Sequence, residues 1–242
     1  MAVTTVYFSS QGRVTRTTGG SPASAWSSVR GTNTTTGNSA GASTNDDFGC
    51  KMEAARGGSV FATNNRAYFY FDLSSIGTTI TAIEFKARGG NNSANLNGDW
   101  TVARANSDGD FGTIATSDYP LVFNSTTSFT SYGANETSWS GNADNTIDLN
   151  ATAITNANSG GELCICLMNY TYDYNDQEVE ENFGNIFNTL NFVTSGTTRA
   201  RLIVSHADAP SGYGNSVNAI VPTNISKINA ILSADISKVN GI

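Results

Sequence analysis

The feature that most restricts the fold of this chain is an aromatic run at residues 66–73, Arg-Ala-Tyr-Phe-Tyr-Phe-Asp-Leu. Aromatic side chains favour β-strands, in which successive side chains point to opposite faces. One face then carries Ala67, Phe69, Phe71 and Leu73, and the other carries Arg66, Tyr68, Tyr70 and Asp72. The first face suits a hydrophobic core, whereas the second places phenols beside charges.

A second strand is expected at residues 80–88, after the turn signal Ser-Ser-Ile-Gly at 74–77. We predict that the two strands pair and form the centre of an all-β, antiparallel sandwich. The composition agrees with this fold, because only 14% of the residues are charged, against about 25% in an average globular domain. The 24 glycines suit short strands joined by many turns.

Alternating or apolar segments predict further strands at residues 1–18, 48–56, 100–104, 146–149, 162–169, 186–193 and 199–205. Residues 19–47 are almost entirely small and polar, so we predict a long loop there with at most one short strand. Asn150 is a good helix N-cap. A short helix is therefore expected at 151–157, ended by Gly160 and Gly161.

The strand expected at residues 162–169 is apolar on both faces. Leu163, Ile165 and Leu167 share one side, and Cys164, Cys166 and Met168 share the other. Only one face of a strand in a two-sheet sandwich meets the core, so the other needs a cover from the predicted helix, a loop or another subunit. We take Cys164, Cys166 and Met168 as candidates for a subunit interface. The cysteines are expected to be reduced and buried, because Cys-x-Cys on a strand favours neither a disulfide nor a metal site.

The sandwich domain is expected to span residues 1–206, followed by a polar linker at 207–216 and a tail at 217–242. Asn-Ile-Ser-Lys-Ile-Asn at 224–229 returns eleven residues later as Asp-Ile-Ser-Lys-Val-Asn at 235–240. Eleven residues match a helical period, and Asn and Asp are good N-caps, so we predict short helical turns. A tail this short cannot fold alone. Its candidates for docking on this domain or on a neighbour are Ile225, Ile228, Ile231, Ile236 and Val239.

Charge and hydropathy argue against nucleic-acid binding and against a transmembrane helix, and they bear on where the protein is located. The net charge is −7 and the pI about 4.6, without a basic stripe, which argues against nucleic-acid binding. No apolar run approaches the roughly 18 residues of a transmembrane helix. The N-terminus lacks the basic and apolar regions of a signal peptide. The composition is nevertheless typical of extracellular and virion-surface proteins. Either a signal has been removed, or the protein assembles in a host cytoplasm and leaves by lysis, as phage proteins do.

No catalytic constellation emerges from the sequence, and we predict that the protein is not an enzyme. His206 is the only histidine, at the end of the last strand, and we expect it at the surface. A serine or cysteine nucleophile would need this histidine as its partner, together with residues that orient the histidine. Acidic residues between 162 and 181 could form a glycosidase pair, but their spacing selects none.

Candidate ligand and metal residues lie in two loops. Tyr172 and Tyr174 flank Asp173 in an acidic segment, and we take these three as candidates for ligand binding. Tyr68 and Tyr70 are instead expected to pack within the sheet. Asp108 and Asp110 alternate around Gly109 as in a calcium loop, although the following positions do not match an EF-hand. A second candidate for a metal is the group Asp173, Asn175 and Asp176. No cofactor is predicted, with a structural Ca²⁺ left open.

Two segments carry a resemblance to known proteins. Residues 66–76, followed by Ile-Thr-Ala-Ile-Glu-Phe at 80–85, resemble the core of a family of jelly-roll-like β-sandwich domains. These domains occur in phage virion proteins and in secreted bacterial adhesins and hydrolases, and they often resemble carbohydrate-binding modules. The likeness covers about residues 3–206. The tail is similar to the I-S-K-I-N-G-V repeats of phage structural proteins, and it departs from them at Ala230, where the repeat usually has glycine.

The resemblance implies a structural protein of the virion surface, as capsid decoration, head fibre or tail fibre. Its partners would be other virion proteins and copies of itself. The alternative is a carbohydrate-binding or adhesion module that contacts host-surface glycans, or a subunit of an extracellular filament.

Overall fold

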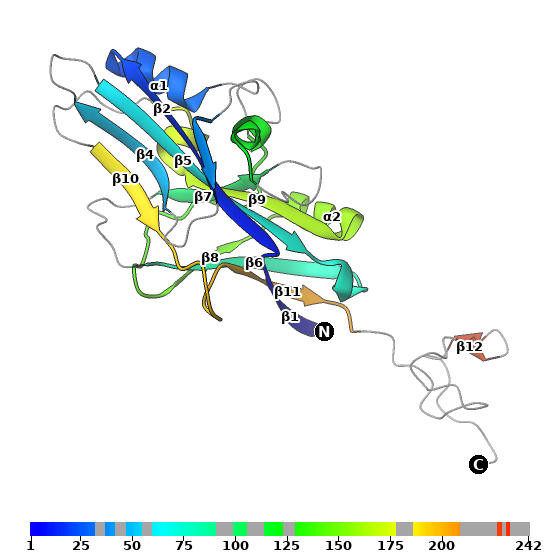
Figure 1. Ribbon diagram of the computed structural model, residues 1–242. Helices are drawn as coiled ribbons and strands as arrows, with labels where there is room; N and C mark the ends of the chain where they lie inside the picture. Colours follow the sequence, from blue (N-terminus) through cyan, green and yellow to red (C-terminus); the bar gives the residue numbers. More distant parts are fainter. Residues whose placement is uncertain are drawn as a thin grey trace.

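The structure is a computed structural model, and it describes residues 1–31, 37–41, 47–54, 60–90, 99–105, 114–122, 129–177, 186–208, 227–228 and 231–232. In these residues two antiparallel sheets enclose a hydrophobic core, with two short α-helices against them (Figure 1). The prediction of an all-β, antiparallel sandwich is confirmed. The jelly-roll order of its strands stays a prediction, as do the boundaries of the domain, linker and tail.

The smaller sheet brings together the first and last strands of the sandwich. Its strands, in spatial order, are β1 (Ala2–Tyr7), β11 (Arg201–His206), β6 (Ile80–Arg88) and β8 (Asp144–Asp148). Each neighbouring pair is antiparallel. The last strand, β11, is therefore an interior strand of this sheet.

The larger sheet has seven strands. Five form the path β10 (Ile186–Asn191), β4 (Asp47–Ala54), β5 (Val60–Asp72), β2 (Ser10–Gly20) and β3 (Ser39–Gly41). The other two are β9 (Glu162–Asn169), which pairs with β5, and β7 (Trp100–Arg104), which pairs with β9. The strand predicted at 66–73 is thus part of a longer strand, and the short strand allowed within 19–47 is β3.

Strand β5 is the centre of this larger sheet. One of its edges pairs with β2 over residues 60–70. Its other edge pairs first with β4, over residues 60–65, and then with β9, over residues 67–72. The aromatic run therefore organises the sheet, as the sequence predicts.

The predicted pairing of the aromatic strand with residues 80–88 is wrong. Those residues form β6, which belongs to the other sheet. A 3₁₀ turn, η1 (Ser74–Ile76), ends at Gly77 in the left-handed region, with φ 62°, and separates the two strands. A side chain is strained at such a φ, which accounts for glycine here. The chain crosses between the sheets instead of forming a hairpin.

The main core lies between the two sheets and joins them through aromatic contacts. The Phe69 ring of β5 lies 5.6 Å from the Phe85 ring of β6 and 5.3 Å from that of Phe192. Phe71 meets Phe85 edge-on at 6.4 Å. Burying one phenylalanine side chain contributes about 1.5–3 kcal/mol. These rings account for much of the contact between the layers.

Both faces of β9 are buried by the same chain. Leu163, Ile165 and Leu167 lie in the main core. Cys164, Cys166 and Met168 are at most 6% exposed and lie in a second core with, among others, Tyr68, Tyr119 and Phe129. The prediction that these three side chains form a subunit interface is wrong, because loops and strands of this chain cover them. Cys164 and Cys166 are free thiols, as predicted.

Of the two α-helices, the sequence predicts one. Helix α2 (Ala151–Gly160) has Asn150 as its N-cap, as predicted. The Asn150 side chain accepts hydrogen bonds from the backbone N–H groups of Thr152 and Ala153. Helix α1 (Pro22–Arg30) occupies part of the predicted loop at 19–47. It has proline in its first turn and buries Ala25, Trp26 and Val29. It packs on β2 and β5 (Figure 1).

The described part of the tail is extended. Strands β12 (Lys227–Ile228) and β13 (Ile231–Leu232) form a small antiparallel pair of their own. The helical turn predicted at 224–229 is therefore wrong at Lys227 and Ile228, and the other residues of the two predicted turns lie outside the described residues. Ile225, Ile236 and Val239 lie outside the described residues.

Candidate functional site

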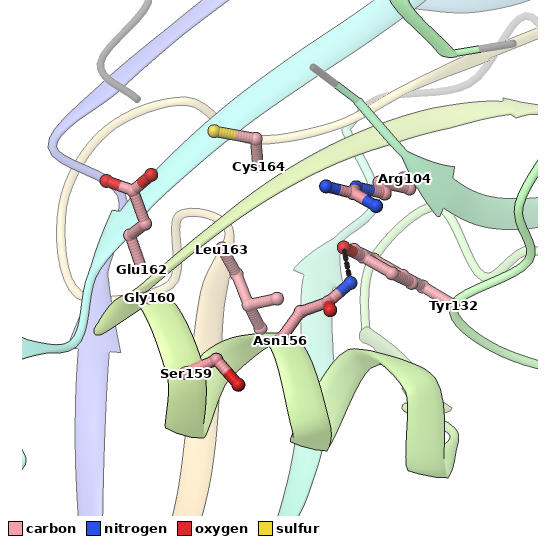
Figure 2. Close-up of a pocket in the computed structure, with 8 residues that line it drawn as sticks. All are labelled: Arg104, Tyr132, Asn156, Ser159, Gly160, Glu162, Leu163 and Cys164. Atoms are coloured by element: carbon pink, nitrogen blue, oxygen red, sulfur yellow. Dashed lines mark hydrogen bonds between the residues drawn. The ribbon is translucent and has the colours of Figure 1, made fainter. Parts of the chain in front are cut away.

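A pocket of about 230 Å³ lies between helix α2, the start of β9 and the end of β7 (Figure 2). The polar side chains that line it are Arg104, Tyr132, Asn156, Ser159, Glu162 and Cys164. Tyr132 and Cys164 are almost completely buried, at 2% and 6% exposure, so they form its inner wall. None of these residues is in the sets that the sequence predicts as ligand-binding. A second, shallower pocket of about 420 Å³ lies beside the η1 turn and the C-terminal part of α2.

Hydrogen bonds fix most of the side chains around this pocket. The Asn156 amide donates to the Tyr132 hydroxyl at 2.8 Å. The Tyr70 hydroxyl donates to Oε2 of Glu162 at 2.9 Å. Burial raises the pKa of Tyr70 to about 12, and the bond to Glu162 adds to that effect. Burial likewise raises the pKa of Tyr132, against the lowering effects of Asn156 and Arg104. Both phenols are therefore neutral hydrogen-bond donors at neutral pH.

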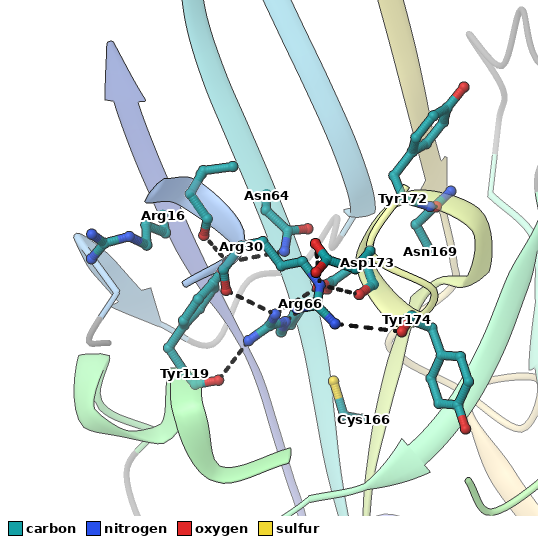
Figure 3. A network of polar contacts seen from close by, with 12 residues as sticks. Arg16, Arg30, Asn64, Arg66, Tyr119, Cys166, Asn169, Tyr172, Asp173 and Tyr174 are labelled. Carbon is teal, nitrogen blue, oxygen red and sulfur yellow. Dashed lines mark hydrogen bonds and ion pairs between the residues drawn. The ribbon is translucent and has the colours of Figure 1, made fainter. Parts of the chain in front are cut away.

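A buried ion pair joins the second face of β5 to the loop after β9 (Figure 3). Arg66 Nε donates to Asp173 Oδ2 at 2.7 Å, and Arg66 Nη2 donates to Oδ1 at 2.6 Å. Both side chains are 0% exposed. Asp173 lies in a π-helical turn, η3 (Tyr170–Tyr174), that begins at Asn169. Two parallel N–H···O bonds of this kind are among the strongest side-chain contacts in proteins.

The rest of the Arg66 guanidinium is also satisfied. Nη1 donates to the backbone carbonyl of Tyr119 at 2.8 Å, and Nη2 donates to that of Arg30 at 3.3 Å. The guanidinium carbon lies 4.0 Å from the centre of the Tyr119 ring. Tyr119 belongs to a 3₁₀ helix, η2 (Thr116–Val122), and Arg30 ends α1. Arg66 thus connects β5 with three other elements.

Tyr119 extends this network further. Its hydroxyl donates to the carbonyl of Val29 at 2.6 Å and accepts from the Asn64 amide at 2.9 Å. The Tyr68 hydroxyl donates to the Tyr119 carbonyl at 3.2 Å. The network therefore holds α1 and η2 against β5.

The electrostatics of the network favour structure over chemistry. Burial, the largest single effect, lowers the pKa of Arg66, but the charge and hydrogen bonds of Asp173 together with Tyr119 and Tyr68 outweigh burial, so the pKa rises well above its usual value. Burial raises the pKa of Tyr68 and of the Cys166 thiol. At neutral pH these two groups stay protonated, so neither supplies a nucleophile or a base.

The structure corrects the predicted ligand-binding loop. Asp173 is fully buried and paired with Arg66, so it is not a surface ligand contact. Tyr172 is half-buried and meets Trp26 edge-on at 6.3 Å. Tyr174 is half-buried and stacks on Tyr170 at 5.6 Å and on Phe129 at 5.8 Å. The two tyrosines therefore pack in part against this chain, and ligand binding by their exposed surface stays a prediction. Tyr68 and Tyr70 pack within the domain, as predicted.

The predicted metal residues Asp108 and Asp110 lie outside the described residues. In the second predicted group, the Asp173 carboxylate is committed to Arg66, and Asp176 forms an ion pair with Arg30 at 3.2 Å. Within the ranges that the structure describes, no three histidine, cysteine or acidic side chains are close enough to hold a metal.

His206 is buried rather than exposed, contrary to the prediction. It is 9% exposed, and its two ring nitrogens lie 3.0 Å from the Thr4 hydroxyl and 2.9 Å from the Thr78 hydroxyl. The histidine therefore joins β1 and the turn before β6 to the end of β11.

The comparisons with known proteins do not place the chain in a family. No protein-family model matches the chain, and no curated protein matches it. Among the described residues, no helix is both long and apolar enough to span a membrane.

Proposed function

We propose that this chain is a structural, non-enzymatic protein of a bacteriophage surface. Its jelly-roll-like sandwich would be displayed, and its C-terminal tail would anchor it. One observation carries the proposal. The last strand of the smaller sheet along the chain, β11, ends at His206, and the described tail strands β12 and β13 pair with each other and with no other described strand. Neither sheet of the sandwich includes these four described residues, which supports a role for the tail outside the sandwich.

Assembly is the role that suits such a tail. An isolated pair of two-residue strands is not stable in water without further packing. The predicted docking side chains of the tail are all large and apolar: Ile225, Ile228, Ile231, Ile236 and Val239. Each would contribute about 1.5–3 kcal/mol if a neighbouring protein buried it fully. Docking on a partner would therefore supply the stability that the tail lacks.

The resemblance of the tail to phage repeats supports a virion partner over a cellular filament. The repeat Ile-Ser-Lys-Ile-Asn at 225–229 and its copy at 236–240 carry that resemblance. The proposed partners are other virion proteins and copies of this chain, on the surface of a particle assembled in the host cytoplasm. Capsid decoration, head fibre and tail fibre all fit this description.

The test compares two double variants of the full chain. I228D/I236D places charges on the apolar positions of both repeats, whereas S226D/S237D places the same charges on polar positions. We expect the first to lose self-association in sedimentation velocity and binding to particles that lack the protein. The second should retain both. Equal behaviour of the two variants would contradict anchoring by the apolar tail.

The adhesion alternative has less support. It placed glycan contacts on Tyr172 and Tyr174, and both side chains pack against aromatic rings of the same chain. Those contacts cover part of each ring and leave less of its surface for stacking on a sugar.

A further inference from the structure

We propose that the pocket between α2, β7 and β9 binds a small organic carboxylate whose far end carries hydrogen-bond donors. The geometry separates a donor end, made by Arg104 and Tyr132, from an acceptor end at Glu162 (Figure 2). This site is independent of the tail and of its proposed role in assembly.

The donor end begins with the Arg104 guanidinium. Arg104 ends β7, and its side chain points into the pocket beside the Tyr132 hydroxyl (Figure 2). Within the described part of the chain, the guanidinium forms neither a hydrogen bond nor an ion pair. A guanidinium presents a planar fork of N–H donors that matches the two oxygens of a carboxylate.

Tyr132 supplies a second donor at this end. Its oxygen accepts the hydrogen bond from Asn156, so its own proton remains to be donated. The ring is 2% exposed, which fixes the position of the hydroxyl. A carboxylate beside Arg104 could accept from both groups.

The acceptor end is made by Glu162 and the facing side of α2. Oε2 of Glu162 already accepts from Tyr70, and the carboxylate has further lone pairs. The Asn156 side chain lies at the donor end, where its amide nitrogen donates to Tyr132 (Figure 2). The Ser159 hydroxyl donates to the Thr155 carbonyl, so its oxygen can also accept. Ammonium or hydroxyl groups on a ligand would satisfy this end.

The backbone keeps the two charged groups apart. Arg104 lies opposite Ile165 in the β7–β9 ladder, three residues along from Glu162. Three residues span roughly 10 Å of strand. No ion pair joins Arg104 to Glu162 in the described residues. A ligand with separated ends would complete both charges at once, and the buried inner wall of Tyr132 and Cys164 would strengthen its contacts.

Two kinds of molecule share this chemistry: a zwitterion with separated charges and a sugar acid. The test titrates the full-length protein with 4-aminobutyrate, glucuronate and butyrate, followed by amide chemical shifts and calorimetry. We expect one or both of the first two to bind with shifts centred on residues 104, 132 and 156–164. Binding of 4-aminobutyrate alone selects the zwitterion, and binding of glucuronate alone selects the sugar acid. Butyrate, which lacks the donors, should bind about tenfold more weakly. If no probe binds, or if butyrate binds equally well, the proposal is overturned.

Variants locate the site. R104Q and E162Q should each weaken binding about tenfold or more. K86Q is the matched control for charge, because Lys86 pairs with Glu84 on the other sheet, and it should bind as the wild type does. S159W blocks the mouth from an exposed position on α2, and it tests the site if R104Q fails to fold. Unchanged binding in R104Q and S159W would overturn the assignment.

Discussion

Arg66 and Asp173 are 107 positions apart in the chain, yet they form a two-bond ion pair with no exposure to solvent. Removing two such charges from water costs several kcal/mol per ion, which only excellent geometry and further hydrogen bonds offset. The carbonyls of Tyr119 and Arg30 supply those bonds to Arg66. The pair therefore fixes the position of α1, η2 and η3 on the sheet.

Removing one partner should destabilise the protein strongly. R66M leaves the Asp173 carboxylate buried without its cation, so we expect the free energy of unfolding to fall by about 3–5 kcal/mol. Urea denaturation followed by tryptophan fluorescence measures this. The double variant R66M/D173L removes both charges of the pair and should recover most of the loss. A single variant within 1 kcal/mol, roughly the value of an exposed pair, would show that the pair contributes little.

The two thiols of β9 should resist modification in the folded protein. Burial raises the pKa of Cys166, and Cys164 is only 6% exposed. The thiolate is the reactive form, so both should react with an aromatic disulfide reagent only on unfolding. A C50A background restricts the readout to these two cysteines. Rapid reaction of two thiols without denaturant would contradict their burial.

The Tyr70–Glu162 hydrogen bond predicts a pH dependence at high pH. The pKa of Tyr70 is about 12 in the folded protein, against 10.0 ordinarily, because burial and Glu162 favour the neutral phenol. The stability that this phenol contributes is complete below pH 10 and is lost as the pH rises towards 12. Tyrosine-labelled NMR titration, with Y70F to assign the signal, measures the value. E162Q should lower it part of the way, since burial is the larger cause. A titration near 10 in the wild type would refute this.

Gly89 and Gly41 form a matched pair for a packing test. A Cβ on Gly89 would lie 1.9 Å from the backbone oxygen of Ser140, whereas one on Gly41 meets nothing within 4 Å. We expect G89A to lower the free energy of unfolding by about 1–3 kcal/mol or more. G41A should be neutral or slightly stabilising, because alanine loses less backbone entropy on folding. Thermal unfolding compares them, and equal midpoints would contradict the close approach at Gly89.

Local signals predict the elements that depend on local physics. The apolar run of β9 and the N-cap at Asn150 each appear in the structure where the sequence places them. The sequence does not predict helix α1, because its nine residues lie within a long run of small, polar residues that is typical of a loop. The available signal was short: Ser21-Pro22 at the start, followed by Ala25, Trp26 and Val29 on one face.

Long-range relations could not be predicted in the same way. The alternation in the aromatic strand assigns Arg66 and Tyr68 to one face, but not what covers that face. The cover comes from α1, η2 and η3, which are distant in sequence. The pocket likewise combines Arg104, Tyr132 and Glu162 from three separate segments. Nothing in the sequence around any of the three residues links it to the other two, so only the folded structure shows that they share a pocket.

The place of β11 between β1 and β6 has a mechanical consequence. A tail that anchors the protein would transmit any pull to the strand that precedes it. Because β11 is hydrogen-bonded on both sides, over six residues to β1 and six to β6, a force along its axis loads both ladders in shear. Many bonds must then break together, whereas an edge strand peeled sideways loses them one at a time. The sandwich is thus best able to bear tension at the end from which the tail leaves.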